Sequence, residues 1–436
     1  MSEDLEFALT PERLDDGSPE EMACFGLLRV RSRNIELISG FDHYTRGIRP
    51  GPLVDGHALG EWLAWNWWKL HWEPRASSAD WWRSHNMTAI GEGYAWPNLE
   101  IYCDGLRAVV HSRASTRPDA KPFRYLGGPP VAVSRAQLQS AVDEYMEYVL
   151  SRLRDDGISS GNIFKLWADV LAERNDPETA RRRKLEALLG REPDVFDPND
   201  LDAFIQEGEL LGASAIEELA ANAGQSGHMF SFDELETMAR GQGEDTSPGD
   251  AVRLDDKSDL GFRAETPAWV IGSKAAKRLR AQEKCGDGRI TDFGLARMAG
   301  IPKDVFANPD NSSALSFALD DSETSGRVVF RSRWKPSRRF DAARLIGDRA
   351  LAVGGDRLRS ATGSGTYRQK MQRSFAAEFL SPFDAVEEML GGDYSAEAQE
   401  EVARHFDVSE RSITTLLVNH RRIDREGLEP DLAPAA

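Results

Sequence analysis

The sequence has few cysteines, no long apolar run and no zinc-peptidase motif of the form H-E-x-x-H. No stretch approaches the roughly 18 consecutive apolar residues of a membrane-spanning helix. Cys24, Cys103 and Cys285 form no C-x-x-C pair, which argues against a disulfide framework and against a cysteine zinc site. The acidic N-terminal segment lacks the basic and apolar regions of a signal peptide. We therefore expect a cytoplasmic protein without a membrane partner.

The composition is that of a soluble globular protein, with 40% apolar and 29% charged residues. A chain of 436 residues is long enough for two or three domains, each with its own core. The net charge of −18 argues against nonspecific nucleic-acid binding by the molecule as a whole.

The pattern of elements predicts an α+β, multidomain protein. Residues 1–155 read as a tryptophan-rich α+β domain, with strands within 22–41 that follow an acidic leader, an apolar helix over 57–72 and a long amphipathic helix over 134–154. A hairpin is expected around Asp104-Gly105. The remaining segments are a helical connector (156–225), an acidic flexible linker (226–259), a mainly helical domain (260–425) and a tail (426–436). Asp197 is a candidate cap for a helix of the connector, and the linker has room for one short helix at FDELETMAR, residues 232–240.

Eight of the eleven tryptophans lie between positions 62 and 96. Trp65, Trp68 and Trp72 recur at helical spacing, which favours an aromatic core. A partner-binding surface and a platform for base stacking are the alternatives, but the window holds few basic residues.

The N-terminal half of the chain contains five histidines, and only His57 and Glu61 share a helix face at i,i+4 spacing. Structural roles are therefore expected for these five: His43, His57, His71, His85 and His111. No nucleophile–base arrangement can be assigned, so the sequence predicts no catalytic residue, no bound metal and no cofactor.

The C-terminal half carries the motifs that suggest a family. Arg339-Phe340 is followed by Ala343-Arg344-Leu345-Ile346-Gly347-Asp348, then by the segment GTYRQKMQRSFAAEFLSP over 365–382 and by EEVARHFDVSERSITTLLVN. Over about 270–423 this order resembles the ImmA/IrrE family of bacterial metallopeptidases. That family has an R-F…A-H-E-L-G-H helix, a second helix with a third ligand and an F-A-A-E segment, and a terminal helix pair.

The resemblance places the zinc chemistry on four positions whose residues have all changed. The two histidine ligands correspond to Arg344 and Asp348, the general-base glutamate to Leu345 and the third ligand to Gln369. An arginine repels a dication, and leucine has no proton chemistry, so the resemblance implies a degenerate zincin-like domain, a pseudo-peptidase. Glu378 falls in the shared F-A-A-E packing segment rather than in the ligand set.

Spacing also suggests what replaces the metal. Residues 344 and 348 lie one turn apart on one helix face. An Arg344–Asp348 pair with Gln369 facing it would join the two helices where the ion once did.

A basic stretch stands out in this acidic chain. Residues 327–373 contain thirteen Lys or Arg and three acids, a local charge of +10. Such a cluster is either a solvated face or an anion-binding face for nucleic acid or an acidic protein. The candidate anion-binding residues are Arg331, Arg333, Lys335, Arg338, Arg339, Arg411, Arg421 and Arg422.

Residues 398–420 have the pattern of a helix-turn-helix, with Ser409 as the N-cap of the second helix. That helix presents Arg411, Thr414 and Thr415. In ImmA/IrrE proteins the terminal helices close the peptidase core, so both core closure and DNA reading stay open.

The resemblance implies a catalytically inactive regulatory protein in bacterial mobile-element, phage-defence or stress regulation. Its partner would be a protein, such as a repressor or a defence-system component, or a nucleic acid. The alternatives are a DNA-binding transcriptional regulator that uses residues 398–420 and an active hydrolase that uses unassigned residues.

Overall fold

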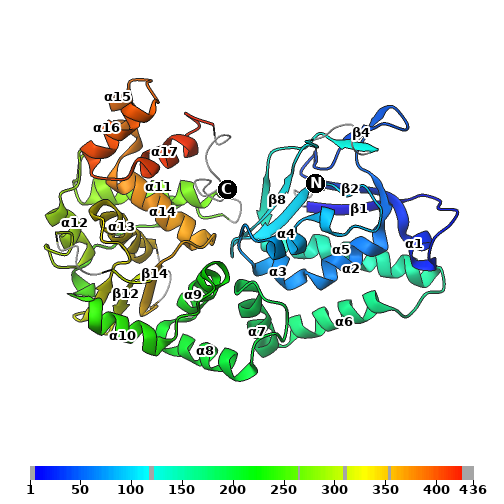
Figure 1. The fold of residues 1–436 in the computed structure, drawn as a ribbon, viewed down its shortest axis with the longest axis horizontal. Helices are drawn as coiled ribbons and strands as arrows, with labels where there is room; N and C mark the ends of the chain where they lie inside the picture. Colours follow the sequence, from blue (N-terminus) through cyan, green and yellow to red (C-terminus); the bar gives the residue numbers. More distant parts are fainter. Residues whose placement is uncertain (1–4, 117–121, 264–265, 308–311, 352–354, 425–436) are drawn as a thin grey trace. The chain divides into compact units, whose positions relative to one another are not determined.

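The computed structural model describes residues 5–116, 122–263, 266–307, 312–351 and 355–424. The chain divides into two compact units, Met1–Val195 and Phe196–Ala436, and each is described by itself (Figure 1). The predicted α+β class is confirmed, with a sheet-rich N-terminal region and a mainly helical C-terminal part. The tail 426–436 lies outside the described residues. Along the described chain, no helix combines the length and the hydrophobicity that a membrane span requires.

Antiparallel sheets form the strand part of the first unit. Their strands are β1 Leu5–Pro11, β2 Phe25–Ser32, β3 Ile35–Glu36, β4 Gly40–Asp42, β5 Gly47–Arg49, β6 Leu53–Asp55, β7 Leu99–Cys103, β8 Arg107–Ser112, β9 Phe123–Tyr125 and β10 Val131–Ser134. One sheet has the order β1-β2-β3 with β6 also paired to β2, and the others have the orders β10-β8-β7 and β5-β4-β9. The predicted hairpin at Asp104-Gly105 is confirmed as the β7–β8 pair.

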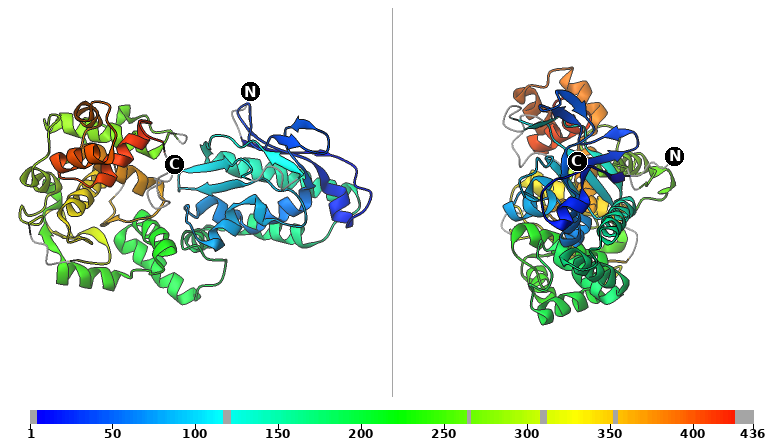
Figure 2. Two further views of the ribbon diagram at one scale, coloured as in Figure 1. Left: turned by 45° about the horizontal axis from the view of Figure 1, so that its top comes forward. Right: turned by 90° about the vertical axis from the view of Figure 1, so that its right-hand side faces the viewer.

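The helices of the first unit are α1 Pro19–Cys24, α2 Gly56–Trp65, α3 Trp67–Trp72, α4 Ala79–His85, α5 Arg135–Asp155, α6 Asn162–Asn175 and α7 Pro177–Leu188. Helices α2, α3 and α5 lie together on one side of the β1–β2 strands (Figures 1 and 2). The long amphipathic helix was predicted correctly as α5, which Ser134 caps by accepting from the backbone N–H of Gln137 at 3.1 Å. The predicted helix over 57–72 is divided at Asn66 into α2 and α3.

The acidic leader proved to be structured. Leu5, Phe7 and Leu9 alternate with less buried residues and pack into the core, which is the two-residue periodicity of a β-strand. The high acid content of this segment had led the sequence analysis to overlook strand β1. In the segment predicted to contain strands, over 22–41, the residues before Phe25 belong to helix α1. The first predicted strand is confirmed as β2, and the second is limited to the two residues of β3.

The segment predicted as a helical connector is divided between the units. Helices α6 and α7 belong to the first unit, because Ile163, Trp167 and Val170 of α6 join its core. Asp197 caps the next helix by accepting from the backbone N–H of Asn199 at 2.8 Å, as predicted.

The second unit combines one sheet with a helical core. Its strands are β11 Glu244–Thr246, β12 Ser316–Asp320, β13 Gly326–Val329 and β14 Leu358–Ala361, in the antiparallel order β11-β13-β12-β14. Its helices are α8 Pro198–Leu211, α9 Ala213–Ser226, α10 Phe232–Gln242, α11 Ala268–Gln282, α12 Asp292–Ala299, α13 Lys335–Leu351, α14 Tyr367–Leu380, α15 Phe383–Leu390, α16 Ala396–Phe406 and α17 Glu410–Asn419. Helix α14 packs against α11 and α13, and the approach to α13 is close: a Cβ atom at Gly347 would lie 2.5 Å from the Phe375 ring.

The segment 226–259 is an ordered part of the second unit, so the prediction of a flexible acidic linker was wrong, whereas the short helix predicted at 232–240 is confirmed as α10. Helix α10 has a full capping box at Ser231, and its Leu235 and Ala239 are buried. Strand β11 pairs with β13, and Asp245 forms an ion pair with Arg327 at 3.1 Å. The average composition of the segment resembled that of a linker, but a few apolar residues at helical spacing were sufficient to anchor it.

Candidate functional site

The positions that the resemblance assigns to zinc chemistry lie on the neighbouring helices α13 and α14. Arg344, Leu345 and Asp348 belong to α13, and Gln369 belongs to the first turn of α14, which the Thr366 side chain caps. All four side chains are buried. The structure therefore encloses the site that the sequence singled out.

Arg344 joins α13 to α14 and to the loop after β14. Its guanidinium donates to Gln369 Oε1 and, at 2.6 Å, to the carbonyl of Thr362. Asp341, one turn earlier, lies 3.5 Å away. Burial lowers the pKa of Arg344, yet a guanidinium remains protonated at any pH that a folded protein tolerates. This position therefore carries a fixed positive charge, whereas a zinc ligand must be a neutral imidazole or an anionic group.

The predicted Arg344–Asp348 pair was wrong, because Asp348 has other partners. Arg368 of α14 holds Asp348 with two hydrogen bonds of 2.6 and 2.7 Å, and Gln372 Nε2 donates to it at 2.8 Å. Arg359 of β14 approaches to 3.4 Å. Burial is the largest single influence and would raise the pKa of Asp348, but the attraction of Arg368 and Arg359 and the hydrogen bonds from Arg368 and Gln372 together lower that pKa. An i,i+4 spacing places two residues on one face, and the neighbouring helix and strand decide which partner each one meets.

Gln369 faces Arg344, as predicted, and its amide is fully used. Its oxygen accepts from Arg344 and from the backbone N–H of Thr362 at 2.8 Å, and its nitrogen donates to the carbonyl of Ser360 at 3.0 Å. A glutamate, the ligand that the resemblance assigns to this position, would place a carboxylate against the Ser360 carbonyl. Glutamine suits this position because it both accepts and donates.

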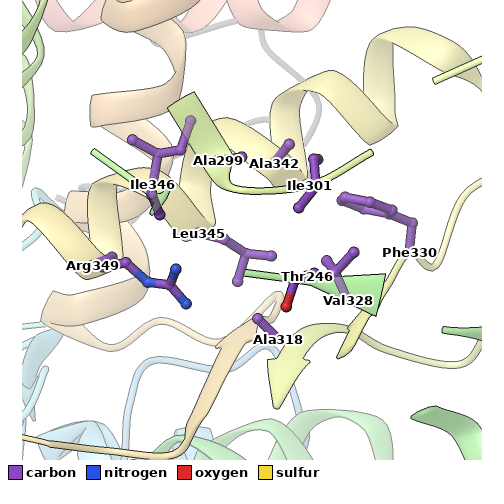
Figure 3. A pocket seen from close by; sticks show the side chains of 11 residues that line it. Thr246, Ala299, Ile301, Ala318, Val328, Phe330, Ala342, Leu345, Ile346 and Arg349 are labelled. Atoms are coloured by element: carbon purple, nitrogen blue, oxygen red, sulfur yellow. The ribbon is translucent and has the colours of Figure 1, made fainter. Parts of the chain in front are cut away.

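Leu345, at the general-base position, lies in an apolar environment. It lines a cavity of about 20 Å³ together with Ala318, Val328 and Phe330, and Figure 3 shows these side chains around it. The space is about one water molecule in size, and its walls are mostly hydrocarbon. A carboxylate here would be desolvated, so the position contributes packing rather than proton transfer.

Helix α9 adds a residue that the sequence did not reveal. Glu218 is buried against the start of α14 and accepts from the Thr366 hydroxyl at 2.8 Å. Burial raises its pKa, and the nearby Arg368 opposes that shift. A carboxylate on a helix of small residues gave no motif that could have identified it.

The prediction of a basic face over 327–373 was largely wrong. Arg339 is fully buried and donates to Asp292 and, at 2.7 Å, to the carbonyl of Ile290. Arg338 is also buried and donates to the carbonyl of Val305 at 2.7 Å. Lys335 is paired with Asp292 at 2.8 Å. The neutralising groups are distant in sequence, so a local count of charges could not find them.

Two of the predicted anion-binding arginines in this stretch remain on the surface. Arg331 and Arg333 are exposed in the segment that leads into α13, and Trp334 beside them is 56% exposed.

The terminal helices close the core of the second unit. Ser409 caps α17, as predicted, and Ile413, Leu416 and Leu417 join the buried cluster. Arg411 and Arg421 are exposed, while Arg422 forms an ion pair with Glu387. Core closure is thus confirmed, and the exposed side of α17 stays available for a partner.

Glu378 of the F-A-A-E segment has a packing role, as expected. It is fully buried and accepts from the Ser273 hydroxyl at 3.1 Å and from the backbone N–H of Phe383 at 3.2 Å. It therefore joins α14 to α11 and to the start of α15.

Most of the tryptophan cluster belongs to the core of the first unit, as favoured from the sequence. The buried members are Trp62, Trp67, Trp68, Trp81 and Trp96. Trp65 and Trp82 are 61% and 43% exposed, so the helical spacing of Trp65 misled the prediction for that residue. A core position also explains His71, which is buried and stacks on Trp67. His57 lies 3.8 Å from Glu61.

Helices α3 and α4 also bring several polar and titratable side chains close together. Lys69 Nζ lies 3.4 Å from Ser84 Oγ, and His85 Nε2 lies 3.8 Å from Glu73 Oε2. Burial raises the pKa of Glu73 to about 8. These four side chains are buried.

Among the described residues, no three His, Cys, Asp or Glu side chains are grouped as metal ligands. Comparisons with protein-family models, curated proteins and solved structures find no match for this chain.

Proposed function

We propose that the protein is a catalytically inactive, ImmA/IrrE-like regulatory protein that binds a protein or nucleic-acid partner. One observation supports this proposal above all: hydrogen-bonded groups occupy the zinc-ligand positions, with Arg344 on Gln369 and Asp348 on Arg368. A metallopeptidase needs ligands around an open coordination position and a base beside the bound water. Neither Arg344 nor Leu345 supplies such a group.

The experiment is a measurement of metal content and proteolysis on the full-length protein. After dialysis against zinc and removal of free ions, we expect far less than one zinc per chain by mass spectrometry of the metal. We also expect no cleavage of a repressor substrate, with or without chelator. Stoichiometric zinc together with chelator-sensitive cleavage would refute the proposal and support the hydrolase alternative.

Partner binding is expected to use the exposed candidates rather than the buried ones. Arg331 and Arg333 lie beside the exposed Trp334, a combination that suits phosphate or an acidic peptide. Fluorescence anisotropy with duplex DNA, followed over a salt titration, tests the nucleic-acid branch. Arg331→Ala with Arg333→Ala should weaken binding and flatten the salt dependence, while the exposed pair Arg240→Ala with Lys284→Ala serves as the control.

DNA reading through the terminal helices is the second candidate, because Arg411 remains exposed on the first turn of α17. In that case Arg411→Ala with Arg421→Ala should reduce binding to one sequence more than to others. Absence of DNA binding by the wild-type protein at low salt would remove both nucleic-acid proposals. A protein partner captured by the wild type and lost with Arg331→Ala/Arg333→Ala would then support the remaining branch.

A further inference from the structure

A polar cavity of about 450 Å³ lies beside the sheet of the second unit. Segment 248–257, the turn between β12 and β13, the end of α13 and the start of β14 form its walls. Its volume falls within the roughly 300–1,000 Å³ of small-molecule sites. Five basic residues contribute to the lining: Arg253, Lys257, Arg349, Arg357 and Arg359.

Two largely buried arginines, Arg349 and Arg359, form the inner wall of this cavity. Arg349 donates to both oxygens of Asp320 at 2.9 Å, and Arg359 Nε approaches the same carboxylate only to 3.6 Å. The Arg359 side chain is 9% exposed, and its Nε finds no hydrogen-bond partner among the described residues. Arg359 also donates to Asp348 at 3.4 Å through Nη1, so the two arginines have two carboxylate partners, and the Arg359 Nε–H is the donor left for a ligand in this poorly solvated wall.

Two more arginines stand at the rim, and their partners are exposed. Arg253 pairs with Glu323 at 3.2 Å, and Arg357 pairs with Asp321 at 3.3 Å. The carboxylates are 73% and 55% exposed and lie on the β12–β13 turn. Exposed ion pairs contribute only about 0–1 kcal/mol, so an incoming anion can displace these carboxylates into water at little cost.

We propose that this cavity binds a small organic phosphate of about nucleotide size. The rim arginines offer planar N–H forks that match phosphate oxygens, and Lys257 adds a third cation. Pro248 and Leu254 supply an apolar wall for the organic part. The lining carries five basic and four acidic side chains, so a phosphate enters a site with a positive balance. The inference is independent of the proposed partner binding, because none of the residues used there lines this cavity.

The test is isothermal titration of the full-length protein with ATP and with inorganic pyrophosphate. We expect saturable binding of ATP with a Kd below about 1 mM, the weak end of specific affinities. Arg253→Glu changes an exposed residue and should preserve the fold. It is expected to raise the Kd about tenfold or more, as reversal of a contacting charge would. Arg240→Ala, an exposed arginine on α10, should leave the Kd unchanged.

A second variant changes affinity in the opposite direction. Asp321→Asn with Glu323→Gln removes the carboxylates that compete with phosphate, so the Kd should fall severalfold. Tighter binding by this variant cannot result from misfolding. Failure of ATP and pyrophosphate to bind the wild type, or equal affinity in all variants, would overturn the proposal. Duplex DNA that binds through Arg253 while ATP does not would also overturn it, because the cavity would then belong to a nucleic-acid surface.

Discussion

Arg344 of α13 donates a hydrogen bond to Gln369 of α14, so the two positions that the sequence resemblance assigns to the first and third zinc ligands contact each other directly. This contact joins the two helices without an ion.

Removal of the Arg344 guanidinium should destabilise the second unit. Arg344→Met keeps most of the apolar stem but leaves the Thr362 carbonyl, Gln369 and Asp341 without this donor. We expect a loss of roughly 3 kcal/mol or more in the free energy of unfolding. Urea denaturation measures it, with Arg331→Met on the exposed neighbouring segment as the control. Equal stability of the two variants would show that the buried network contributes little.

Asp348 should make stability depend on pH at the acidic end. Its folded pKa is lowered by Arg368, so its contribution is fully present above the unfolded value of about 3.9 and is lost as the pH falls through the folded pKa. Asp348→Asn should cost about 3–5 kcal/mol near neutral pH, because it leaves Arg368 and Arg359 without their shared carboxylate. The difference from wild type should shrink in acid. Asp245→Asn, in an exposed pair with Arg327, should change little. A difference that persists unchanged in acid would contradict this assignment.

Glu73 should produce the opposite dependence in the first unit. Burial raises its folded pKa to about 8, so the carboxyl group stays protonated in the folded protein after the unfolded chain has ionised. Its contribution is therefore fully present below the unfolded pKa and is lost as the pH rises through about 8. Glu73→Gln should match the wild type in mild acid and exceed its stability at about pH 9. Thermal unfolding across pH measures this, with the exposed Glu144→Gln as the control, and a variant without gain at alkaline pH would refute the assignment.

The boundaries of the second unit can be tested with fragments. Residues 196–436 should fold alone, because they include α9, α10 and β11. A fragment that starts at residue 260 loses β11 from the sheet edge and Glu218 from the network, and we expect it to be largely unfolded. Circular dichroism and urea titration distinguish the two. Cooperative folding of the shorter fragment would mean that residues 196–259 are dispensable.

The sequence by itself determined the local features of this protein. Asp197 and Ser409 were identified as helix caps, Ser134 as the approximate start of a helix, and Asp104-Gly105 as a turn, because capping and turn formation depend on adjacent residues. The apolar spacing of α5 and of the F-A-A-E segment likewise marked the faces that pack. The sequence also located the region of the candidate site, since the four positions that the resemblance assigns to zinc chemistry are all buried.

Only the tertiary structure decided which charges meet. The sequence predicted Arg339 as a surface cation, but in the structure it donates to Asp292 and to the Ile290 carbonyl. The sequence likewise paired Asp348 with Arg344, but in the structure Asp348 accepts from Arg368. Both contacts join segments about 20 to 50 residues apart, and a guanidinium donates to whichever carboxylate or carbonyl packing places beside it. The segment 226–259 shows the same limit, because pairing of β11 with β13 depends on a strand far along the chain.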